Sequence, residues 1–168
     1  MPLTIRAATA ADVPEMHSMI RELAEYEREL DKVVATEADL RQALFVGPAG
    51  SDAGPALHGH VAEVDGAVVG MALWFLSYST WTGTHGIYLE DLFVRPAARG
   101  LGVGTALLET LAGICVERGY HRMAWSVLDW NESAIAFYRN IGAGPMSEWT
   151  TYRLADEKLA AFGDAANR

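Results

Sequence analysis

The stretch from Tyr88 to Thr105 constrains the fold most, because it joins a strand to a helix through a basic, glycine-rich turn. Residues Tyr88 to Val94 are aromatic, apolar and branched, which favours a buried strand, and Pro96 ends it. Arg99-Gly100-Leu101-Gly102-Val103-Gly104 then leads into an apolar helical pattern. Glycines at a helix entry let backbone N–H groups approach a ligand, and the helix N-terminus favours an anion. The sequence therefore predicts a strand–turn–helix unit that suits a pyrophosphate.

The glycine spacing excludes two common nucleotide-binding motifs. Gly100-x-Gly102-x-Gly104 differs from the dinucleotide fingerprint G-x-G-x-x-G, and no Lys-Ser/Thr follows the last glycine as a P-loop requires. A plain structural alternative stays open at this point, in which the glycines only shape a tight turn between strand and helix.

Two adjacent carboxylates, Glu90 and Asp91, interrupt the predicted strand. Carboxylates in a buried strand are costly unless they are paired, hydrated or used in chemistry. The structural alternative for Glu90 is an ion pair with a buried arginine such as Arg122. The functional interpretation is that Glu90 accepts a proton from a substrate.

Composition places limits on the kind of protein. The chain has 168 residues, which fits one domain spanning 1–168, and half of them are hydrophobic, without a run long enough to cross a bilayer. We expect no membrane association and no signal peptide, and the single cysteine, Cys115, fits a reducing cytoplasm. The formal net charge of −9 disfavours nucleic-acid binding and favours a cationic substrate.

Alternating strands and helices predict an α/β layout. Asp65-Gly66 is a hairpin signal between two of the strands, and residues 47–55 predict a loop. Strands are expected at Leu3–Ala7, Leu57–Val64, Ala67–Phe75, Tyr88–Val94, Arg122–Leu128 and Trp149–Leu154. Helices are expected after the capping signals at Thr9 and Thr36, from Val103 to Cys115, over Ala134–Arg139 and over Asp156–Phe162.

Several other side chains have two interpretations. Tyr26 and Glu27, in an acidic helix end, either lie on a solvated face or form the mouth of a polyamine-like acceptor site. Trp81 lies in a loop, where it would wall a substrate pocket or stack on an ammonium group. His58 and His60 share one strand face, but no third ligand accompanies them, so we expect no metal site.

Two motifs resemble those of GNAT N-acetyltransferases. One is Arg-Gly-x-Gly-x-Gly after Leu-Phe-Val-x-Pro, and the other is Asn131-x-x-Ala-x-x-Phe-Tyr138 followed by Gly-Ala. Nearly the whole chain outside the 47–55 loop resembles the diamine (spermidine/spermine) branch, which includes relatives acting on thialysine. The segments that carry this narrower resemblance are Ile5–Asp12, Glu22–Glu27, Tyr88–Val94 and Trp130–Glu132.

The resemblance implies a mixed, mostly antiparallel sheet with helices on both faces and central strands that splay apart to admit acetyl-CoA. It implies that backbone groups of Leu92, Phe93 and Val94 pair with pantetheine like an added strand. Asn131 and Tyr138 would flank the thioester. The pyrophosphate would be held by Arg99, Gly100, Leu101, Gly102, Val103, Gly104 and Thr105.

The chain departs from the pattern of the diamine acetyltransferases after Tyr138. We include Arg139 among the cofactor-binding residues, but Asn140 and Ile141 follow it where those enzymes carry further basic residues. The nucleotide phosphates would therefore be held more weakly or through other contacts.

The resemblance also implies a reaction, direct transfer of acetyl to the primary amine of a small cationic acceptor. Glu90 would take the amine proton and Tyr138 would protonate the leaving thiolate. A bulge in the strand, as the family has, would bring Glu90 and Asp91 together toward the acceptor, which Tyr26, Glu27 and Trp81 would also contact. We further expect a homodimer. Acetylation of protein lysines or N-termini, and a noncatalytic acetyl-CoA-binding module, stay open as alternatives.

Overall fold

The computed structural model describes residues 2–48 and 52–164. They fall into two compact units, Met1–Ser126 and Val127–Arg168, each of which is described by itself. The single domain expected for residues 1–168 stays a prediction. Residues 49–51 of the predicted loop lie outside the described part of the chain.

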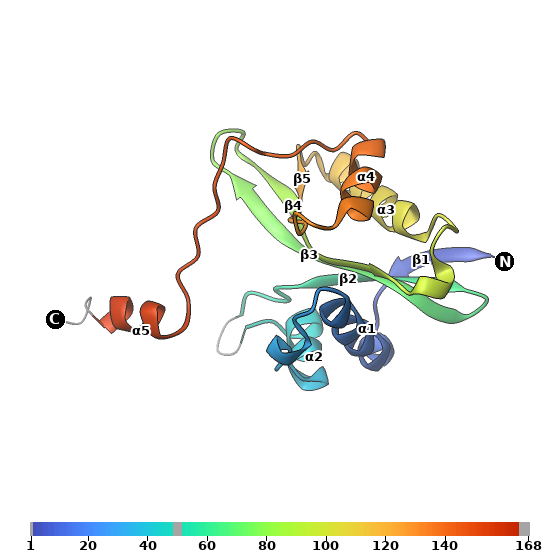
Figure 1. The fold of residues 1–168 in the computed structure, drawn as a ribbon, viewed down its shortest axis with the longest axis horizontal. Coiled ribbons are helices and arrows are strands. Elements are labelled where there is room, and N and C mark those ends of the chain that lie inside the picture. The colour runs from blue at the N-terminus through green and yellow to red at the C-terminus, as the bar shows by residue number, and fades with distance from the viewer. Residues whose placement is uncertain (1, 49–51, 165–168) are drawn as a thin grey trace. The chain divides into compact units, whose positions relative to one another are not determined.

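A five-stranded sheet forms the centre of the first unit, with its strands in sequence order (Figure 1). Antiparallel pairing joins the first four strands, and the last pair is parallel. The predicted turn at Asp65-Gly66 has positive φ at both residues, as a tight hairpin requires. The strands are β1 (Leu3–Ala7), β2 (His58–Val64), β3 (Ala67–Ser79), β4 (Thr84–Val94) and β5 (Met123–Ala124).

Helices cover both faces of this sheet. Helices α1 (Val13–Tyr26) and α2 (Glu37–Phe45) lie on one face and α3 (Val103–Arg118) lies on the other, as Figure 1 shows. Short 3-10 turns η1 (Ala10–Asp12) and η2 (Leu30–Lys32) flank α1, and η3 (Pro96–Ala98) connects β4 with α3. The predicted class, a mixed and mostly antiparallel sheet with helices on both faces, is confirmed.

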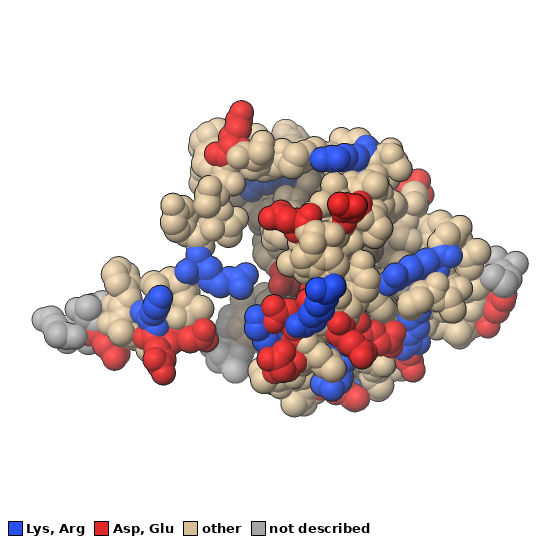
Figure 2. Space-filling view, viewed as in Figure 1, with Lys and Arg blue, Asp and Glu red and all other residues tan. Residues whose placement is uncertain are grey.

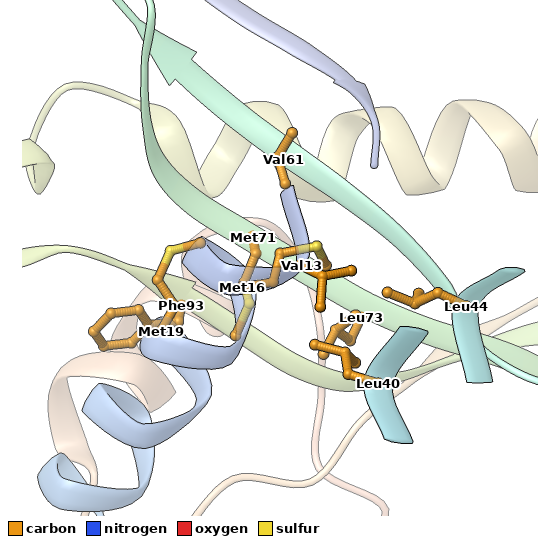
Figure 3. Close-up of a cluster of buried hydrophobic side chains, with 9 residues drawn as sticks. All are labelled: Val13, Met16, Met19, Leu40, Leu44, Val61, Met71, Leu73 and Phe93. Atoms are coloured by element: carbon orange, nitrogen blue, oxygen red, sulfur yellow. The ribbon is translucent and has the colours of Figure 1, made fainter. Parts of the chain in front are cut away.

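The main hydrophobic core lies between α1, α2 and the sheet (Figure 3). Fully buried methionines on α1 meet apolar side chains of β3 and β4, and burial of each such side chain is worth about 1.5–3 kcal/mol. This packing fixes α1 over the two strands that carry the site described below. The cluster consists of Val13, Met16, Met19, Leu40, Leu44, Val61, Met71, Leu73 and Phe93.

A partly buried ion-pair network ties the start of α1 to the sheet. Arg6 on β1 donates to Asp12 through both terminal nitrogens at 2.7 Å and to Glu63 on β2 at 2.7 Å. The hydrogen bonds from Arg6 lower the pKa of the Asp12 carboxyl to about 2. Asp12 also accepts from the Thr9 backbone, so the predicted Thr9 capping signal is present.

One predicted strand is wrong in extent and another is not formed. The segment expected at Arg122–Leu128 pairs with β4 only over Met123–Ala124, because no described strand lies beside the rest of it. Trp149–Leu154 forms no strand, since no other strand of the described chain lies paired with it. In contrast, β3 and β4 are longer than expected, reaching Ser79 and starting at Thr84.

The second unit contains two short helices, α4 (Glu132–Asn140) and α5 (Asp156–Asp164), close to the expected positions. Asn131 caps α4 by accepting from the Ala134 N–H at 3.2 Å. Apolar side chains between and within these helices are exposed, including Met146, Trp149, Tyr152, Leu154, Leu159 and Phe162.

Among the described residues, no helix combines the length and the apolar character that crossing a membrane requires.

Candidate active site

Glu90 is an extra residue in β4. Leu73 of β3 lies opposite Asp91 and the next residue, Trp74, lies opposite Leu89, so the register shifts and Glu90 has no partner. The bulge predicted for this strand is therefore present. Beyond it, Asp91 shares a strand face with Phe93, whose ring packs in the core beneath α1 (Figure 3).

The bulge brings three carboxylates into electrostatic contact. Burial raises the pKa of Asp91 to about 6, and the negative charges of Glu90 and Glu27 add to the effect. The pKa of Glu27 is itself raised, first by burial and then by Glu29. Glu90 is exposed, and the ion pairs of the described residues do not include it, while Arg122 donates to the Tyr78 carbonyl instead.

The other two predicted acceptor residues, Tyr26 and Trp81, lie in different parts of the first unit. Tyr26 is the last residue of α1, adjacent to Glu27. Trp81 is 87% exposed in the β3–β4 turn, and the strand from Thr84 to Glu90 covers about 20 Å, so the structure does not bring Trp81 to the carboxylates.

One edge of β4 is free next to the bulge. Strand β5 pairs with β4 only at Ile87 and Tyr88, and no described strand pairs with that edge farther along. This is the splaying that the resemblance predicts. The Arg95 N–H donates to Val69 of β3 at 2.9 Å. Because backbone groups alternate in direction along a strand, Leu92 and Val94 point to the free edge while Phe93 points to β3.

The glycine turn follows η3, between β4 and α3. Gly100 and Gly102 have φ of 77° and 78°, which L side chains rarely adopt, and no atom lies within 4 Å of where a Cβ would stand. The first hydrogen bond of α3 runs from Ala106 to Gly102. The N–H groups of Val103, Gly104 and Thr105 therefore have no intrahelical acceptor, as at any helix start. The exposed Leu101 completes a turn that leaves backbone donors accessible to an anion.

The other predicted cofactor residues lie on the second unit. Asn131 is the N-cap of α4, and Tyr138 is half-buried on that helix with its ring 5.4 Å from the ring of Phe137. Arg139 is exposed in the last turn of α4.

His58 and His60 do share one face of β2. Both rings stack on Trp74, at 4.4 Å and 6.1 Å between centroids, and the Trp74 Nε1–H donates to His60 Nδ1 at 3.1 Å. Burial lowers the pKa of both imidazoles. Within the described ranges, no group of three or more His, Cys, Asp or Glu side chains is arranged to hold a metal ion.

Sequence reasoning missed the part played by Arg95. Its guanidinium pairs with Glu15 at 2.8 Å and Glu22 at 3.0 Å on α1, and it donates to the Val68 carbonyl at 3.1 Å. It thereby joins α1 to the end of the β3–β4 pair. The available signal was the spacing of Glu15 and Glu22, which puts both on one helix face.

Comparison with known proteins decides the family. The model described as "Acetyltransferase (GNAT) family" matches residues 16–143. The chain belongs to the GNAT acetyltransferase family. As a GNAT protein it is an N-acetyltransferase, and the resemblance seen in the sequence is confirmed.

Individual relatives of this GNAT chain include a thialysine N-epsilon-acetyltransferase from Sus scrofa, 36% identical over 92% of this chain and 94% of that protein. The human spermidine/spermine N(1)-acetyltransferase-like protein 1 is 34% identical over 92% of this chain but only 23% of its own length. A solved integron cassette protein from the mobile metagenome of V. cholerae has a TM-score of 0.78 with 24% identity, covering 97% of this chain and 98% of its own. At that identity the structure supports the fold alone.

We expect the Asp91 carboxyl to titrate near pH 6, and Glu27→Gln to lower its pKa because one of the negative charges that raise it is removed. The measurement is a carbon-13 NMR titration of the side-chain carboxyl. Glu37→Gln, in the first turn of α2, is the matched control and should leave the titration unchanged. An Asp91 pKa near 4 in the native protein would contradict this geometry.

Proposed function

We propose that this GNAT enzyme transfers the acetyl group of acetyl-CoA to the primary amine of a small cationic acceptor, such as a diamine, a polyamine or thialysine. The bulge of β4 supports this proposal most strongly, because it groups Glu90 and Asp91 with Glu27 beside the free strand edge. A positively charged amine is favoured next to these carboxylates, since opposite charges attract strongly where solvent is partly excluded.

Charge and relatives both support a cationic acceptor. The chain carries a net charge of −9, although on the face in Figure 2 acidic side chains are interleaved with basic ones over α1 and α2. Selectivity would therefore come from the local group and not from a uniformly acidic surface. The names of two relatives, for thialysine and for spermidine/spermine, refer to compounds that carry primary amines.

The same strand leads to the proposed cofactor site. Pantetheine would add to the free edge of β4 through the backbone groups of Leu92 and the N–H of Val94, whose carbonyl already accepts from Arg99 Nε, with Phe93 supporting them from the core side. The pyrophosphate would accept hydrogen bonds from the turn of residues 99–105 and gain from the dipole of α3. Asn131, Tyr138 and Arg139 are included on the resemblance of their motif.

The chemistry requires two proton transfers. An alkyl amine has a pKa of about 10, so it must lose a proton before it attacks the thioester. We assign that step to Glu90, directly or through water, with Asp91 positioning the acceptor. A strand N–H on the free edge would stabilise the oxyanion, and Tyr138 would protonate the departing thiolate. The transfer is direct, within a ternary complex, since Cys115 is buried and its thiol pKa is raised chiefly by burial.

We also propose that two copies associate through the exposed apolar side chains of residues 146–162, and that the enzyme works in the cytoplasm. A monomer in sedimentation velocity at micromolar concentration would refute the dimer, and recovery in a secreted or membrane fraction would refute the location.

A screen of acceptors tests the function. Spermidine, spermine, putrescine, thialysine, lysine and peptides are each incubated with acetyl-CoA while thiol release is followed. We expect kcat/KM to be highest for a small diamine, polyamine or thialysine, because these amines are cationic near pH 7. Highest activity on peptides would favour a protein acetyltransferase, and acetyl-CoA binding without turnover would favour a noncatalytic module.

Two variants test the assigned proton transfers. Tyr138→Phe keeps the ring, so it should bind acetyl-CoA normally but turn over about 10²- to 10⁴-fold more slowly, in proportion to the lost acid catalysis. Glu90→Gln should regain activity at high pH, where the amine is already neutral. Wild-type activity should fall as the pH drops through about 6 and Asp91 takes up a proton.

Full turnover by Tyr138→Phe would assign thiolate protonation to another group. A loss of activity that is equal at every pH in Glu90→Gln would make Glu90 a positioning residue. Asp91→Asn distinguishes the roles of the two carboxylates. If Glu90 is the base, the activity lost in Asp91→Asn should not recover at high pH.

A further inference from the structure

The cation of Arg99 lies against the end of α1. Its guanidinium carbon is 5.5 Å from the ring centroid of Tyr26 and 5.9 Å from that of Phe93, distances at which a cation is attracted to an aromatic face. Its Nε–H donates to the carbonyl of Val94 at 3.0 Å. One side chain thus joins the last residue of α1 to the edge of β4 and to the start of the glycine turn.

The end of α1 needs such a cation. The helix has no basic residue in its last turn, where Glu25 and Glu27 lie, while Glu22 one turn earlier is already paired with Arg95. The C-terminal end of a helix carries partial negative charge, so this arrangement is unfavourable unless a positive group approaches from elsewhere. Arg99 brings a positive charge to this end through space, in addition to Arg28, which follows Glu27 in the chain. Among the described residues, Arg99 forms no ion pair with a carboxylate.

Arg95 and Arg99 act on α1 from the two ends of η3. Arg95 pairs with Glu15 and Glu22 along the helix, and Arg99 holds Tyr26 at its end. Arg95 therefore holds the middle of α1 over the strands, and Arg99 contacts Tyr26, the residue before Glu27. Glu27 follows Tyr26 directly and its N–H donates to the Leu23 carbonyl at 2.9 Å, so a contact that holds Tyr26 also limits the movement of Glu27.

We propose that Arg99 is a positioning residue for the acceptor, in addition to its place in the cofactor turn. It holds Tyr26, and through it Glu27, against β4, so that the turn that binds the pyrophosphate also sets the geometry of the acceptor mouth. This inference rests on the proposed function for its kinetic consequence and on the Tyr26–Arg99 contact for its structure. It predicts that acceptor affinity depends on Arg99 even when acetyl-CoA is saturating.

A double-mutant cycle at saturating acetyl-CoA tests the kinetic consequence, with thialysine as the acceptor. Arg99→Gln and Tyr26→Leu should each raise the acceptor KM about two- to fivefold, the size expected of one exposed cation–π contact, with kcat changed less. The acceptor KM of the double variant should be no higher than that of the more impaired single variant. In a Tyr26→Phe background, Arg99→Gln should keep its full effect, because the ring is still present.

Arg21→Gln is the matched control, since it removes an exposed positive charge from the same helix, five residues before Tyr26. Its acceptor KM should match that of the wild type. Additive effects of Arg99→Gln and Tyr26→Leu, or an effect of Arg99→Gln on acetyl-CoA affinity alone, would overturn the proposal.

An NMR measurement on arginine-labelled protein tests the contact without reference to activity. The Arg99 Nε–H resonance should move in Tyr26→Leu, because a ring beside the guanidinium is lost, and should not move in Tyr78→Leu, at the far end of the β3–β4 hairpin. If no acceptor is acetylated, this arm still decides the contact while the proposed function fails. If the resonance does not move, the positioning role fails while the proposed function stands.

Discussion

The extra residue in β4 is the constraint on which the rest of the site depends. Without it, strict alternation would send Glu90 and Asp91 to opposite faces of the sheet. With it, Asp91 lies on the α1 face, where burial and the charges of Glu90 and Glu27 raise its pKa to about 6. A carboxylate in this state is poorly solvated when ionised, which makes an incoming ammonium group its natural partner.

The bulge would be ineffective if α1 were free to move away. Core packing through Met16 and Met19 holds the helix on the sheet, and Arg6 ties its start to β1 and β2 through Asp12 and Glu63. Arg95 and Arg99 then hold its middle and its end from the connection between β4 and α3. The turn proposed to bind the cofactor is thus also the element that fixes the helix bearing Glu27.

Much of the first unit was predictable because its signals are local. Asp65-Gly66 specified the hairpin, Pro96 the end of β4, and Gly100 and Gly102 the positive φ of the turn. The extents of β5 and of the expected strand at Trp149–Leu154 were wrong because a strand exists only where another backbone pairs with it, which composition does not report. The sequence also did not show that Trp81 lies far from the carboxylates, because that distance follows from the length of β4.

The contacts of Arg95 and Arg99 with α1 could not be predicted from the sequence, since they join residues about seventy positions apart. The family, in contrast, could be inferred from the glycine turn and the Asn131–Tyr138 motif, and it is confirmed. The roles of individual site residues stay predictions.

The free edge of β4 is proposed to receive the cofactor. Amide hydrogen exchange with and without acetyl-CoA tests it most directly, because Leu92 and Val94 point to that edge while Phe93 already faces β3. We expect bound acetyl-CoA to slow exchange at Leu92 or Val94 and in the first turn of α3, with Phe93 protected in both states. Unchanged exchange at Leu92, Val94 and Val103 to Thr105 under saturating acetyl-CoA would contradict it.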